Sequence, residues 1–83
     1  MTKQEILEKT NSFFVEKLDF DASQIYADAE LRRDLGISSV DAVAIANFAQ
    51  KTFGCPIIML ELKAIVTMED LYAYIENHLK AES

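Results

Sequence analysis

Two adjacent serines, Ser38 and Ser39, follow the segment Asp34-Leu35-Gly36 and precede a long stretch rich in alanine and valine. Ser38 and Asp41 have the Ser-x-x-Asp spacing of a capping box, in which each side chain accepts a hydrogen bond from the other residue's backbone N–H. The pattern predicts Ser38 as the N-cap of a helix and Ser39 as its first residue. Unpaired N–H groups and the helix dipole favour negative charge there, so a phosphate ester on the Ser39 hydroxyl would be stabilised.

The same segment resembles the attachment motif of the acyl carrier proteins, which reads Asp-Leu-Gly, one variable residue, Asp-Ser-Leu and a further Asp. This chain has Asp34-Leu35-Gly36, Ile37, Ser38-Ser39-Val40 and Asp41. The resemblance implies that Ser39 carries a 4′-phosphopantetheine arm and that Gly36, Ser38 and Asp41 complete the attachment site. It extends over nearly the whole chain, since apolar residues occupy the family's core positions at Phe13, Leu18, Ile25, Leu31, Leu35, Phe53, Ile65 and Ile75.

The implied function is that of a carrier without catalytic activity. Acyl intermediates would be held as thioesters on the arm for fatty-acid, polyketide or specialised lipid biosynthesis. The implied partners are a phosphopantetheinyl transferase, which takes the arm from coenzyme A, and acyl-processing enzymes such as a ketosynthase or acyltransferase. Tethering would give each docked active site a high effective concentration of the intermediate.

Two features depart from the family pattern. Ser38 replaces the acidic residue that, in the family, helps the transferase and its metal ion. The helix that follows carries only Asp41 and Lys51 as charged residues, where the family usually has several carboxylates. We therefore expect partners to bind mainly through apolar contacts, with Val40, Met59 and Leu60 beside Asp41.

Two alternative functions stay open at this point. A peptidyl carrier would share the fold, but its usual Gly-Gly-x-Ser pattern differs from Gly36-Ile37-Ser38-Ser39. A helical protein-interaction module without a cofactor is the other alternative, because Ser-x-x-Asp is also a common way to begin a helix.

The elements that position these residues are predicted by apolar periodicity and by helix-capping pairs. Apolar residues at helical spacing predict helices over residues 3–17, 39–53 and 68–80, with a loop and a short further helix within 55–63. A long loop covers residues 19–38, with a possible helical turn near 29–33. The chain is thus expected to form one all-α domain over residues 1–83, a small four-helix bundle.

The central helix and the segment after it suggest space for an acyl chain. Ala42, Ala46 and Ala49 are small where larger apolar residues would fit, and the segment containing Ile57 and Leu62 is more apolar than one short helix needs. This segment either gates a pocket for the acyl chain or docks a partner. Arg32 and Arg33 either form a solvated surface or contact the phosphate of the cofactor.

Charge and composition exclude other classes of function. The net charge of −6 argues against binding to nucleic acid or to anionic membranes. Cys55 is the only cysteine, and no apolar run is long enough for a membrane span, so we expect a cytoplasmic monomer. Neither Cys55 nor His78 has the neighbours that a catalytic nucleophile or base needs, and no metal site is expected.

Overall fold

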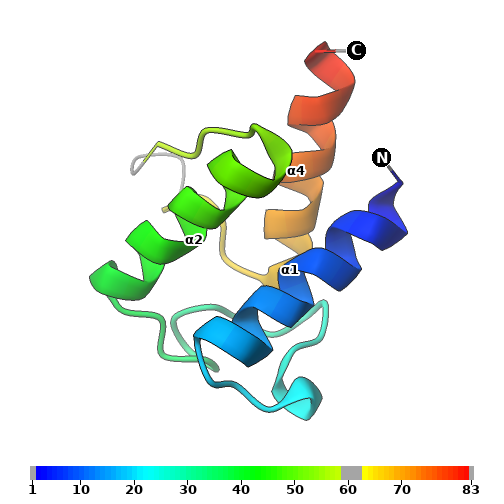
Figure 1. Cartoon of the computed structure of the whole chain (residues 1–83). Helices are drawn as coiled ribbons and strands as arrows, with labels where there is room; N and C mark the ends of the chain where they lie inside the picture. The colour runs from blue at the N-terminus through cyan, green and yellow to red at the C-terminus, as the bar shows by residue number, and fades with distance from the viewer. Residues whose placement is uncertain (1, 59–62, 83) are drawn as a thin grey trace.

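The structure is a computed structural model that describes residues 2–58 and 63–82. It contains the α-helices α1 (Lys3–Lys17), α2 (Ser39–Phe53) and α4 (Met68–Glu82), and a short 3-10 helix, η1 (Ala22–Gln24) (Figure 1). The predicted all-α bundle is confirmed, and α4 continues two residues beyond the predicted end at Lys80. The short helix predicted within residues 55–63 falls partly on residues 59–62, which lie outside the described residues.

Reciprocal capping begins α1 and α4. In α1 the Glu5 N–H donates to Thr2 Oγ1 at 3.2 Å, and the Thr2 N–H donates back to the Glu5 carboxylate. In α4 the Asp70 N–H donates to Thr67 Oγ1 at 3.1 Å, and the Thr67 N–H donates to Asp70 Oδ2. These bonds satisfy N–H groups that the first turn of a helix leaves unpaired, which explains why the capping pattern located both starts.

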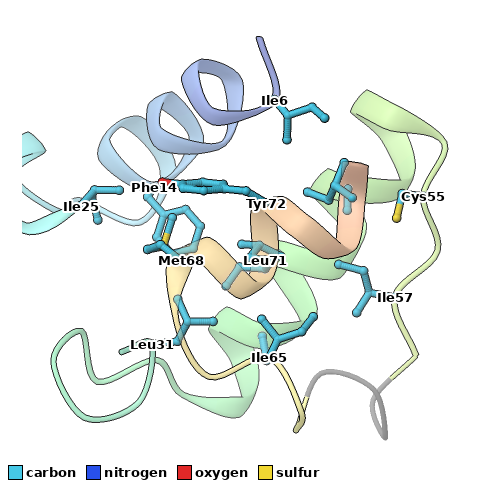
Figure 2. Close-up of a cluster of buried hydrophobic side chains, with 14 of the residues drawn as sticks. Ile6, Phe14, Ile25, Leu31, Cys55, Ile57, Ile65, Met68, Leu71 and Tyr72 are labelled. Atoms are coloured by element: carbon cyan, nitrogen blue, oxygen red, sulfur yellow. The ribbon is translucent and has the colours of Figure 1, made fainter. Parts of the chain in front are cut away.

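The core lies where α4 packs against α1 and α2. Phe14 and Ile6 of α1 meet Tyr72, Leu71 and Met68 of α4, and all five side chains are fully buried (Figure 2). The Tyr72 hydroxyl donates a hydrogen bond to Asn11 Oδ1 of α1. Phe13 of α1 stacks on Phe48 of α2 with ring centroids 4.4 Å apart.

The long first loop is fixed in two ways. Its side chains Ile25, Ala29, Leu31 and Leu35 are buried in the core, whereas Tyr26 is 53% exposed. Its backbone pairs with the start of α4. The Met68 N–H donates to the Ala29 carbonyl and the Glu69 N–H to the Ala27 carbonyl, both at 3.0 Å, and the Leu31 N–H donates to the Val66 carbonyl at 2.9 Å.

Candidate functional site

Ser39 is placed by the backbone turn and cap that precede α2. Gly36 has φ +63°, a left-handed conformation that glycine adopts without strain. Ser38 is the N-cap and has an extended backbone conformation. Its Oγ accepts a hydrogen bond from the Asp41 N–H at 3.2 Å, and Asp41 Oδ2 accepts one from the Ser38 N–H at 3.2 Å. The predicted capping box is confirmed. It places Ser39 at the first helical position, with its side chain exposed.

A cavity of about 360 Å³ lies beside Ser39. It is enclosed by the end of the first loop, the first two turns of α2 and one residue that precedes α4. Its lining residues are Leu31, Arg32, Gly36, Ile37, Ser38, Ser39, Ala42, Ile45 and Ile65. The volume falls within the range of small-molecule sites, and most of the side chains in the wall are apolar.

The cavity contains only part of the set that the sequence suggested for an acyl pocket. Ala42 lines it. Ala49 and Ile57 are buried in the hydrophobic core, and neither they nor Ala46 are among the lining residues. Leu62 lies outside the described residues. The space therefore opens between α2 and the first loop, and Leu31, Arg32, Ile37, Ile45 and Ile65 are the wall residues that sequence reasoning did not assign to it.

The sequence as a whole matches known proteins. A family model described as phosphopantetheine attachment site matches residues 12–75. An acyl carrier protein of Thermotoga maritima is 36% identical over 78 residues, covering 94% of this chain and 96% of the relative. An acyl carrier protein of Rubrobacter xylanophilus is 31% identical and covers 98% of this chain and all of the relative. One from Cyanidioschyzon merolae is 34% identical over the full chain and 91% of its own length.

The chain belongs to the acyl carrier protein family. Acyl carrier proteins are carriers rather than enzymes, and their cofactor is 4′-phosphopantetheine, so the acyl carrier prediction is confirmed over the two alternatives.

The surface of α2 differs from the charged surface that is usual for an acyl carrier protein. Val40 is 78% exposed and Val43, one turn further along the same helix, is 49% exposed. Asp41 is half-buried and its carboxylate is engaged in the cap. Ile58 adds a further exposed apolar side chain, at 56%. Met59 and Leu60, the other predicted partner contacts, lie outside the described residues.

Other chemistry is not assembled in the part of the chain that the structure describes. No three His, Cys, Asp or Glu side chains there are grouped as metal ligands. No described helix is both long enough and apolar enough to cross a membrane. Cys55 is fully buried and follows the C-terminal end of α2, whereas Ser39 is at the N-terminal end of that helix.

Proposed function

We propose that the Ser39 hydroxyl is the attachment point of the 4′-phosphopantetheine arm. The observation that carries this proposal is the different state of the two adjacent serines. Ser38 Oγ accepts a hydrogen bond from the Asp41 N–H, and this cap is what begins the helix. Ser39 is exposed, and its hydroxyl makes no hydrogen bond within the described residues.

The surroundings of Ser39 suit the group that would be attached there. A phosphodiester on Ser39 Oγ would lie at the positive end of the α2 dipole, beside a cavity whose lining holds Arg32 and no acidic side chain among the described residues. When bound, the arm supplies a terminal thiol that holds an acyl group as a thioester. The protein's part is to position the attached group and to offer apolar walls from Leu31, Ala42 and Ile45 next to it.

Partner recognition follows from the surface next to Ser39. Val40 and Val43 form an apolar strip on a helix whose only charged residues are Asp41 and Lys51. We propose that the modifying transferase and the acyl-processing enzymes, such as a ketosynthase or acyltransferase, contact this strip together with Ile58. The pathways proposed are fatty-acid, polyketide or specialised lipid synthesis, carried out by a monomer in the cytoplasm.

The attachment site is tested by intact-protein mass measurement after incubation with a broad-specificity phosphopantetheinyl transferase and coenzyme A. The wild type should gain the mass of one phosphopantetheine, and Ser39→Ala should gain none. Ser38→Ala is the matched control, because it removes the neighbouring hydroxyl and leaves Ser39 in place. Helical circular dichroism should be retained in Ser39→Ala, since alanine is a good helix former at this first helical position. It should be retained in Ser38→Ala as well, since loss of the cap costs only about 1 kcal/mol. An unmodified wild type, or a fully loaded Ser39→Ala variant, would overturn the proposal.

A further inference from the structure

Arg32 is the only charged residue among the described residues that line the cavity beside Ser39. This is notable in a chain with a net charge of −6. If the phosphodiester is attached at Ser39, its phosphorus lies one covalent bond from Ser39 Oγ, at the wall of the cavity that Arg32 shares. The covalent bond delivers the phosphate to this place, so no independent affinity for an anion is needed.

Three carboxylates near Arg32 in the sequence, those of Glu30, Asp34 and Asp41, have partners other than Arg32. Asp34 Oδ2 accepts from the Glu30 N–H at 2.9 Å, and Asp41 Oδ2 accepts from the Ser38 N–H at 3.2 Å. The Glu30 carboxylate lies 3.7 Å from the guanidinium of Arg33. Arg32 itself has no ion pair with any residue that the structure describes. Its neighbour Arg33 is therefore paired, and Arg32 is the guanidinium left available.

Arg32 also stands at the boundary of a second cavity, of about 220 Å³, that it lines with Glu30, Arg33 and Lys63. Its side chain thus has two directions open to it. One leads to Arg33, Lys63 and the Glu30 carboxylate, which is already paired with Arg33. The other leads to Ser39 and to no other charged side chain among the described lining residues. A negative group on Ser39 would favour the second direction by simple electrostatics.

We infer that the Arg32 guanidinium binds the two non-bridging oxygens of the phosphodiester attached to Ser39. This subsite rests on the proposed attachment at Ser39 and adds a positioning residue to it. The planar fork of Arg32 matches two phosphate oxygens, which a lysine ammonium does not. By holding the phosphate against the cavity, Arg32 directs the start of the arm over the apolar walls of Leu31 and Ile45.

The test compares wild type, Arg32→Gln, Arg32→Lys and Arg33→Gln, each prepared without the arm and with it. Mass measurement first establishes complete loading at Ser39. The melting temperature of the loaded form minus that of the unloaded form is then measured for each protein. This difference should be smaller in Arg32→Gln than in wild type by about 1–5 °C. Arg33→Gln should match the wild type, and Arg32→Lys should lie between the two.

A second measurement separates a phosphate contact from a general effect on folding. The phosphorus NMR signal of the loaded protein should shift on Arg32→Gln and not on Arg33→Gln. High salt should move the wild-type signal toward the Arg32→Gln position, because screening weakens the contact. The Nε–Hε signal of Arg32 should also shift on loading.

The two proposals fail in different ways. A wild type that gains no arm, or gains it away from Ser39, overturns the attachment site and this subsite together. The subsite alone is overturned if loading at Ser39 is complete and wild type and Arg32→Gln have the same phosphorus signal and the same melting difference. Equal effects of Arg32→Gln and Arg33→Gln would likewise overturn it, since they would show a general charge effect in place of a specific contact.

Discussion

Replacing Ser38 by alanine should separate the cap of α2 from the chemistry of Ser39. The change removes the acceptor of the 3.2 Å bond from the Asp41 N–H and leaves the Ser39 hydroxyl untouched. Loss of an N-cap side chain costs about 1 kcal/mol, and this cap is exposed enough for water to replace part of the bond. The melting temperature should accordingly fall by about 4–8 °C, the shift that 1 kcal/mol causes in a domain of this size.

Urea unfolding of three variants would test this reasoning. Ser38→Asp keeps an oxygen acceptor at the N-cap and should unfold close to the wild-type midpoint. Asp41→Ala removes the reciprocal bond to the Ser38 N–H, also 3.2 Å long. Because the two bonds form one unit, the double variant Ser38→Ala/Asp41→Ala should lose less free energy of unfolding than the two single losses added together.

Measurements of unfolding and of loading could each refute this account of Ser38. A Ser38→Ala midpoint equal to that of the wild type would show that the cap contributes nothing. A Ser38→Asp variant as unstable as Ser38→Ala would show that the acceptor oxygen is not what matters. We also expect Ser38→Asp to be loaded faster by a general transferase, because it restores the residue usual in the family. Slower loading would contradict our account of that departure.

Four further predictions concern the rest of the molecule. Thr10→Val should raise the free energy of unfolding by about 1 kcal/mol, because the buried Thr10 hydroxyl has no hydrogen-bond partner among the described residues. A lower urea midpoint would contradict this. Hydrogen bonds from the backbone N–H groups of Thr67 and Val66 hold the pKa of Asp70 below its ordinary value of 3.8. The stability that this carboxylate contributes is therefore lost as pH falls through the lowered pKa. Asp70→Asn should reduce the loss of stability below about pH 4. Val40→Ala should weaken cognate complexes while moderate salt does not, and the reverse pattern would argue for electrostatic docking. A long acyl group on the arm should raise the melting temperature and slow amide exchange around Leu31, Ala42 and Ile45 if it enters the cavity beside Ser39, and no change in either would leave only partner docking for the apolar surface.

The helices were predictable because their signals are local. Caps at Thr2, Ser38 and Thr67, with Gly54 in left-handed conformation after α2, set the helix ends through bonds between residues a few positions apart. The same locality explains why the roles of Ser38 and Ser39 were separable before the structure was known. Whether a residue caps a helix or follows the cap depends on its nearest neighbours alone.

The cavity was less predictable because its walls come from distant parts of the chain. Ile65 lies 26 positions after Ser39 in the sequence, and Leu31 reaches the cavity only because the loop is held against α4. Small residues in α2 indicated that space was available, but not on which side of the helix. Ala42 lines the cavity, whereas Ala49, about two turns further along α2, is packed in the core. Periodicity places a residue on a face, and only packing decides what covers that face.

The three helix starts share one capping chemistry and use it for different purposes. At α1 the cap is exposed and only begins the helix. At α4 the first N–H groups also bond to the Ala29 and Ala27 carbonyls, and so fasten the first loop to the bundle. That fastening places Arg32 and Leu31 beside α2, where the cap at Ser38 leaves Ser39 exposed. The site therefore depends on α4 as much as on α2. The position of Ser39 is set by a local capping motif. The cavity next to it depends on backbone hydrogen bonds between the first loop and α4, such as that from the Met68 N–H to the Ala29 carbonyl, which join residues almost 40 positions apart.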